Sequence, residues 1–167
     1  WRGKSRPPRA GCGRAPAPPA DLSPYEPVAL PRQEVNVTYP GLGRVKALLI
    51  PREIAAGADF GYSVRMDIDP AIDHKEFHEA VVFLHVKNEA GEHVASLDFP
   101  LRKVSMADHL IHHYPGRFDA TLPPGRYVIE GGIYNIRTRI RHDFEPTDAH
   151  NANVRKRFFR WGEITVR

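Results

Sequence analysis

The chain has 167 residues, of which 41% are hydrophobic, 13 are glycine and 16 are proline. This size and composition suit one domain with a single core and a tail, and no run of eighteen apolar residues that could cross a bilayer is present. Since Cys12 is the only cysteine, no internal disulfide can form, and the cysteine content does not identify a redox compartment.

The net charge of +4 is concentrated in two segments. Residues 1–20 carry five basic residues and no acidic one, and residues 136–160 carry seven basic residues against three acidic ones. Two basic segments therefore flank an acidic body. This distribution favours contact with an anionic surface, such as an acidic protein, a lipid headgroup, an anionic glycan or nucleic acid. Solvated loops without a partner are the alternative interpretation.

Half of the prolines lie within the first 31 residues. Proline fixes φ and removes a backbone donor, so this composition is typical of an extended segment without regular structure. We therefore predict that residues 1–42 form a tail or linker rich in proline and arginine, and that residues 43–167 form the folded domain.

From residue 43 onward, apolar residues recur with a period of two. Residues 59–69 alternate strictly, with Phe60, Tyr62, Val64, Met66 and Ile68 on one face, which predicts a strand with one buried face. Further strands are predicted at the positions 43–51, 79–88, 93–101, within 116–135, and 154–167. A hairpin turn at Gly91 joins two of them.

Helical spacing is weak throughout the chain. Only residues 102–114 show apolar residues three to four apart, with Ser105 as a candidate N-cap. The longest irregular connection, 141–154, is of the kind that often carries function. The pattern as a whole predicts an all-β fold, an antiparallel immunoglobulin-like (Greek-key) sandwich that follows an extended tail.

One stretch indicates how the two sheets are joined. In "LPPGRYVIEGGIYN", residues 122–135, a turn at Gly125 precedes Tyr127 at the head of a strand. This arrangement resembles the tyrosine corner of Greek-key sandwiches, in which the phenol hydroxyl bonds to upstream backbone. Gly125 and Tyr127 are therefore assigned structural roles.

The order "FLHVKNEAGEHVASLDFPL", "LPPGRYVIEGGIYN" and "RWGEITVR" is similar to that of bacterial extracytoplasmic immunoglobulin-like modules, including those appended to membrane glycosyltransferases. The resemblance covers roughly residues 58–167. This chain lacks the Trp-Pro-Gly often present before the corner in those modules, and its final loop is longer and rich in arginine. The resemblance implies the fold and an extracytoplasmic setting, and transfers no catalytic residue, because such modules generally have none.

Three groups of residues are candidates for binding. The first is a set of basic residues expected to contact a partner: Arg137, Arg139, Arg141, Arg155, Lys156, Arg157 and Arg160. The second is a set of aromatic residues that would bind glycan if they were exposed on one sheet face: Tyr114, Tyr134 and Trp161. In "RFFRW", alternation along a strand would place at least one aromatic set in the core.

The third candidate group is a metal site formed by Met106, His109 and His113. If this segment is helical, the two histidines share one face, and Met106 adds a soft ligand that favours copper. No HExxH pattern or cysteine pair supports the site, and a histidine-rich surface loop is the alternative.

Motifs for catalysis are absent from the sequence. There is no GxSxG elbow, no phosphate-binding GxxxxGK and no dinucleotide-binding GxGxxG, so we expect no enzymatic activity and no cofactor. The sequence predicts a non-catalytic accessory module that docks on protein subunits of a larger, membrane-associated assembly. A carbohydrate-binding module and a His/Met metal-binding domain are the alternatives, and nucleic acid is not the expected partner.

Overall fold

The computed structural model describes residues 30–101, 114–145 and 157–167. Most of these residues are in strands: β1 (Arg32–Tyr39), β2 (Gly43–Leu49), β3 (Glu53–Ile54), β4 (Asp59–Ile68), β5 (Ala80–Lys87), β6 (His93–Ser96), β7 (Phe99–Pro100), β8 (Tyr114–Arg117), β9 (Gly125–Asn135) and β10 (Phe159–Val166). A short helix, α1 (His74–Glu79), lies between β4 and β5. No helix in these described ranges is long and apolar enough to span a membrane.

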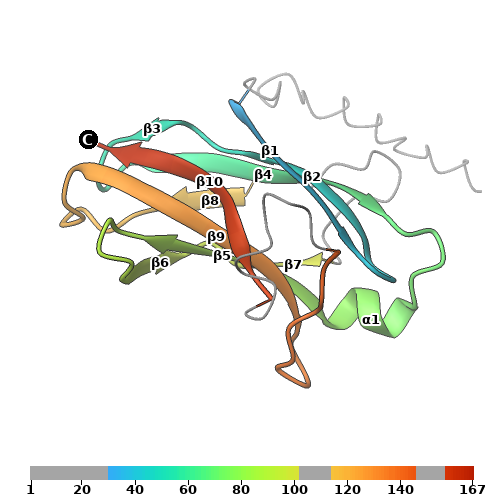
Figure 1. Cartoon of the computed structure of the whole chain (residues 1–167). Coiled ribbons are helices and arrows are strands. Elements are labelled where there is room, and N and C mark those ends of the chain that lie inside the picture. Colours follow the sequence, from blue (N-terminus) through green and yellow to red (C-terminus); the bar gives the residue numbers. More distant parts are fainter. Residues whose placement is uncertain (1–29, 102–113, 146–156) are drawn as a thin grey trace, which may run out of the picture.

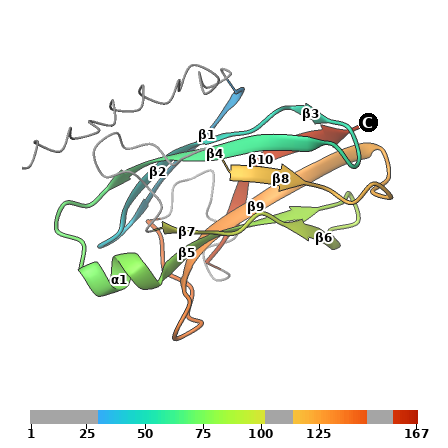
Figure 2. The same cartoon turned by 180° about the vertical axis from the view of Figure 1, so that it is seen from behind.

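The strands form two sheets that face each other (Figure 1). The four-stranded sheet has the order β1-β2-β4-β8, and all its neighbours are antiparallel. The six-stranded sheet has the order β3-β10-β9-β5-β6, with β7 also pairing with β5. Its pairs are antiparallel except for β3, which runs parallel to β10. The view from behind shows β8 beside β4 in the four-stranded sheet (Figure 2).

The prediction of a β-rich sandwich is confirmed. The alternation predicted for β4 is also correct, because the apolar residues assigned to one face are those that face the core. Tyr62, Val64, Met66 and Ile68 are buried in the core between the sheets, and Phe60 packs against its margin. The strand predicted at 93–101 is divided into β6 and β7, because Leu97 and Asp98 interrupt the pairing with β5.

The predicted boundary between tail and domain is wrong in the structure. Residues 32–39 were assigned to the tail, but they form β1, in which Val35, Val37 and Tyr39 are buried. The pairing of β1 with β2 shifts between Glu34 and Val37, so a β-bulge accommodates these residues. The folded domain therefore begins before residue 43, whereas residues 1–29 of the predicted tail lie outside the described residues.

The helix α1 was not predicted. Asp73 precedes it, and its Oδ1 accepts hydrogen bonds from the backbone N–H groups of Lys75 (2.8 Å) and Glu76 (3.0 Å). This is the geometry of an N-cap. The helix predicted at 102–114 lies almost entirely outside the described residues.

The hydrogen bond predicted for Tyr127 is present. Its hydroxyl donates to the carbonyl oxygen of Pro123 at 2.7 Å, and its ring is buried at the start of β9. Gly125 is the first residue of this strand. The bond ties the turn before β9 to the strand itself.

Candidate functional site

The outer face of the six-stranded sheet carries an aromatic cluster. Val82 and Leu84 of β5 belong to the core, so Phe83, between them, points to the opposite face. Phe83 is nevertheless only 2% exposed, because the rings of His85, Tyr134 and Phe158 surround it at centroid distances of 4.8, 6.1 and 6.4 Å. A second, small layer of packing therefore covers this sheet.

Gly132 makes this layer possible. It lies opposite Phe83 in the pairing of β5 with β9. A Cβ atom on Gly132 would lie 2.6 Å from Phe83 Cζ and 2.8 Å from the carbonyl oxygen of Arg157. The absence of a side chain at this position lets the Phe83 ring and the 157 backbone approach the sheet closely.

Arg141 lies across this cluster. Its guanidinium carbon is 5.0 Å from the centroid of the Phe83 ring and 4.9 Å from that of Phe158. These are cation–π distances. Arg157 supports the same segment, since its Nη1 donates to the carbonyl oxygen of Arg141 at 3.1 Å and its Nε pairs with Asp143 at 2.6 Å. The Arg141 guanidinium thus packs against two aromatic rings, and Arg157 holds the Arg141 backbone.

A hollow of about 260 Å³ opens beside these rings. It is lined by Phe83, His85, Asp98, Tyr134, Arg139 and Arg141, and we refer to it as the β5 hollow. Burial lowers the pKa of His85, an effect that the nearby Asp98 carboxylate opposes. Burial also raises the pKa of Asp98, although its Oδ1 accepts a hydrogen bond from the Leu84 N–H. The lining therefore combines two guanidinium groups with one partly buried carboxylate.

The turn that follows β9, residues 135–141, is built around Asn135, and we refer to it as the tip turn. The Oδ1 atom of Asn135 accepts from the backbone N–H groups of Arg137 (2.9 Å) and Thr138 (3.0 Å). Its backbone carbonyl accepts from Arg139 N, whose residue has φ +62°. Figure 1 shows the tip turn extending from the end of the sandwich beside α1. Its backbone conformation is fixed by these bonds.

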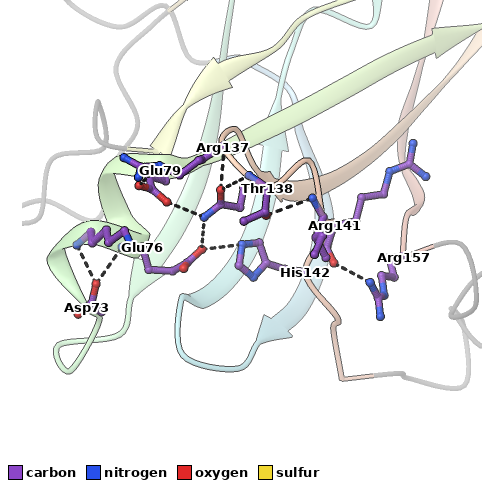
Figure 3. Close-up of polar contacts among 11 residues, drawn as sticks. Asp73, Glu76, Glu79, Arg137, Thr138, Arg141, His142 and Arg157 are labelled. Carbon is purple, nitrogen blue, oxygen red and sulfur yellow. Dashed lines mark hydrogen bonds and ion pairs between the residues drawn. The ribbon is translucent and has the colours of Figure 1, made fainter.

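A polar network connects the tip turn to α1 (Figure 3). Asn135 Nδ2 donates to the carboxylates of Glu76 (3.3 Å) and Glu79 (3.1 Å). Arg137 Nε lies 2.9 Å from Glu79 Oε1, and His142 Nε2 lies 2.9 Å from Glu76 Oε1, off the direction of a straight hydrogen bond. Burial lowers the pKa of His142, and Glu76 opposes that shift. The carboxylates of Glu76 and Glu79 thus contact residues at the start of the tip turn and directly after it.

The tip turn also displays apolar side chains to solvent. Ile136 is 47% exposed and Ile140 is 59% exposed, whereas the next most exposed large hydrophobic side chain of the described residues, Val94, is 36% exposed. Arg137 and Arg139 lie between the two isoleucines in the sequence. The tip turn therefore carries both exposed apolar side chains and arginines on a backbone whose conformation is fixed.

The structure brings together part of the predicted basic set. Arg137, Arg139, Arg141 and Arg157 surround the tip turn and the β5 hollow. Arg160 does not join them, because it pairs with Glu163 and lines a separate hollow together with Arg32 and Arg52. Arg155 and Lys156 lie outside the described residues.

The predicted glycan-binding set does not form one surface. Trp161 is only 2% exposed, because β10 directs it into the core over Gly131, so its predicted role in stacking against sugars is wrong. Tyr114 belongs to β8 in the four-stranded sheet, whereas Tyr134 belongs to the other sheet, where it lines the β5 hollow. As predicted for "RFFRW", one aromatic set is core: Phe159 and Trp161.

The predicted metal ligands Met106, His109 and His113 lie outside the described residues. Within the described ranges, no group of three or more histidine, cysteine, aspartate or glutamate side chains is arranged to hold a metal ion. The residues that sequence reasoning missed are Phe83, His85, Asp98 and Asn135. The apolar character of both faces of β5 was a signal for the first two, since it indicates that something covers the outer face.

Comparisons of the chain with known protein families and with curated proteins find no match.

Proposed function

We propose that the chain is a non-catalytic, immunoglobulin-like interaction module that docks on a protein partner through the tip turn and its arginines. The setting that we propose is an extracytoplasmic, membrane-associated assembly. The absence of catalytic motifs from the sequence supports a non-catalytic role, and the resemblance of the strand motifs to extracytoplasmic modules supports the setting.

Strand order supports the immunoglobulin-like part of the proposal. The chain moves from β4 in one sheet to β5 in the other, returns to β8, and crosses again to β9. Such crossings between two sheets are typical of Greek-key sandwiches, as is a tyrosine whose hydroxyl bonds to backbone before the strand. Tyr127 makes this bond.

The observation that carries the docking proposal is the exposure of Ile136 and Ile140 in a turn of fixed conformation. Protein interfaces are enriched in apolar and arginine anchors that become buried on association. A turn that is already ordered by Asn135 loses little conformational entropy on binding. Arg137 and Arg139, which lie between the two isoleucines in the sequence, favour a partner surface that has acidic residues next to an apolar pocket.

The test compares three forms of the full chain: the unmodified protein, the double variant Ile136→Ser/Ile140→Ser, and the control Val94→Ser on β6. Each is cross-linked in the organism that makes the protein, and the recovered proteins are quantified by mass spectrometry. We expect a stoichiometric partner that Val94→Ser retains and the double variant loses at least tenfold. Recovery of the same proteins by all three forms, or of none by the unmodified chain, would overturn the proposal. Thermal melting of each form shows that the fold is retained.

A further inference from the structure

A third hollow, of about 440 Å³, lies at the end of the sandwich where β9 begins. It opens between the turn that joins β5 to β6 and the turn that precedes β9, and Figure 1 shows both turns at this end. We refer to it as the corner hollow. Its apolar lining includes four exposed side chains: Ala90, Val94, Pro123 and Pro124. No strand of the described residues pairs with the outer edge of β6, so this apolar surface is accessible.

The corner hollow differs in charge from the other two hollows. Glu89 lines it and has no ion-pair partner among the described residues, and the same holds for Glu92 in the same turn. The single cation of the lining, Arg126, pairs with Glu163 at 3.3 Å. In the β5 hollow, and in the hollow that Arg160 lines, arginines outnumber carboxylates. A cationic segment with apolar side chains would therefore bind in the corner hollow rather than in the other two.

The chain itself contains a segment of this kind. Residues 6–19 read "RPPRAGCGRAPAPP", with three arginines, five prolines and no acidic residue. Proline-rich segments bind to apolar grooves at a low cost in entropy, because proline restricts their conformation before they bind. Residues 6–19 thus match the corner hollow in both charge and apolar character.

The segment can reach the corner hollow from the point where the described chain begins. Gln33, near the start of β1, bonds to the backbone of Glu163 in β10. Glu163 pairs with Val128, and Val128 pairs with Lys87 at the end of β5. Neighbouring strands lie about 4.8 Å apart, so the distance from β10 to β5 is about 10 Å. Residues 20–29 can span about 30 Å, at about 3.1 Å per residue in the polyproline conformation, and this tether is long enough.

We propose that residues 6–19 bind in the corner hollow of the same molecule. The arginines of the segment pair with Glu89, and its proline rings pack against Val94 and the two prolines of the lining. Arg126 retains N–H donors for backbone carbonyl groups of the segment, because a guanidinium has five N–H groups and a single carboxylate pairs with this one. This contact is separate from the docking proposal, which depends on the two isoleucines of the tip turn.

The test is paramagnetic NMR spectroscopy of the full chain, with a nitroxide spin label on Cys12, the only cysteine. The label lies between the two proline runs of the segment, so it broadens backbone signals near the place where the segment binds. We expect the signals of Ala90 and Val94 to lose at least half of their intensity relative to the chain with reduced label. The signal of Thr138, in the tip turn, should keep nearly all of its intensity. Raising the salt concentration should weaken the broadening, because ionic contacts are screened.

Variants of the labelled chain separate this contact from a general collapse onto the domain. Glu89→Gln removes the unpaired carboxylate and Val94→Ser removes the exposed apolar group, and each should at least halve the loss of intensity at Ala90. Glu145→Gln is the matched control, because it removes an exposed charge outside the hollow without breaking an ion pair of the described residues. It should change the loss of intensity by less than a tenth.

Three results would overturn the proposal. The first is the absence of broadening at the corner hollow, and the second is an equal effect of Glu145→Gln and Glu89→Gln. The third is equal broadening of an isotope-labelled Cys12→Ser chain mixed with the spin-labelled chain, because the contact would then join two molecules. Val94→Ser should weaken this contact but retain the partner of the tip turn, so failure here is distinguishable from failure of the docking proposal.

Discussion

At the scale of single residues, Gly132 is required by the close approach of Phe83. We expect Gly132→Ala to destabilise the fold by about 1–3 kcal/mol, because the new methyl group would overlap the Phe83 ring and the Arg157 carbonyl oxygen. Gly125→Ala on the same strand is the control, since a Cβ there meets only Tyr127, at 3.9 Å. Urea unfolding measures both variants. Equal stability of the two variants would show that the residues around Phe83 can shift to accommodate a methyl group at position 132 without lowering the free energy of unfolding.

His142 is one of two histidines whose burial makes stability depend on pH. Burial lowers its pKa in the folded protein, whereas in the unfolded chain histidine titrates near pH 6.5. Below about pH 6.5, and until the lower folded pKa is passed, the unfolded state binds more protons, so stability falls as pH falls. We expect His142→Gln to lose less stability than the unmodified chain between pH 7.5 and 5.5.

The measurement is the free energy of unfolding in urea at the two pH values. His78→Gln, on the exposed surface of α1, is the control and is expected to follow the unmodified chain. Burial also lowers the pKa of His85, so this residue too reduces stability as the pH falls. His142→Gln should therefore reduce the pH dependence of stability without abolishing it. If the stability of His142→Gln depended on pH as strongly as that of the unmodified chain, His142 would not be a cause of the pH dependence.

At the scale of elements, Asn135 joins β9, the tip turn and α1. Asn135→Asp retains both backbone hydrogen bonds to its Oδ1 but places a third carboxylate beside Glu76 and Glu79. We expect a loss of at least about 2 kcal/mol at pH 7, because a buried donor becomes an acceptor that faces like charges. Lowering the pH should restore part of this loss as the carboxyl groups become protonated.

A similar turn provides the control for this substitution. Asn88 accepts from Glu92 N at 2.9 Å and donates to Glu92 Oε2 at 2.7 Å, but it is in contact with one carboxylate only and its bonds are exposed to solvent. We expect Asn88→Asp to cost less than Asn135→Asp in the same urea measurement at pH 7. Equal effects would indicate that the network with α1 does not stabilise the tip turn.

The elements also show which features the sequence could predict. Strict alternation predicted β4, because its apolar residues face the core and the residues of the other face, apart from Ser63, are not buried. The alternation of Val35, Val37 and Tyr39 is equally visible, but the nearby Pro31 and Pro40 gave this segment the composition of a tail. The helix α1 has only six residues, too short for a periodic signal. Local patterns predicted the long strands except β1, and they missed the short helix α1.

The candidate site was less predictable than the fold for a similar reason. A run of arginines is visible in the sequence, but the pairing of Phe83 with Gly132 depends on the register between β5 and β9. The role of Asn135 depends on α1, which lies more than 50 residues earlier. Alternation along β10 places Phe159 and Trp161 on one face, but only the packing of the two sheets decides that this face is the core. No local sequence pattern encodes these long-range relationships.

At the scale of the whole molecule, β1 connects the two sheets. It pairs with β2 in the four-stranded sheet, and its Gln33 reaches β10 in the other. Gln33 Nε2 donates to the Glu163 carbonyl at 2.8 Å, and Glu163 N donates to Gln33 Oε1 at 2.8 Å. The Gln33 side chain thus bonds to the β10 backbone as a neighbouring strand would. Removing β1 should therefore weaken the packing of both sheets.

Two truncated chains test this expectation. A chain of residues 30–167 retains β1, so its melting temperature should be within a few degrees of that of the full chain. A chain of residues 43–167, which begins at the boundary predicted from the sequence, loses four buried side chains: Val35, Val37, Tyr39 and Leu42. At about 1.5–3 kcal/mol for each, this loss is comparable with the whole stability of an ordinary domain.

We therefore expect residues 43–167 to show no cooperative melting transition in circular dichroism, or one lowered by more than about 10 °C. Equal melting of the two truncated chains would mean that the rest of the sandwich is stable without β1. A large loss in residues 30–167 as well would show instead that residues 1–29 contribute to the fold. Because Gln33 is the link to β10, Gln33→Ala in the 30–167 chain should reproduce part of the loss without removing the strand.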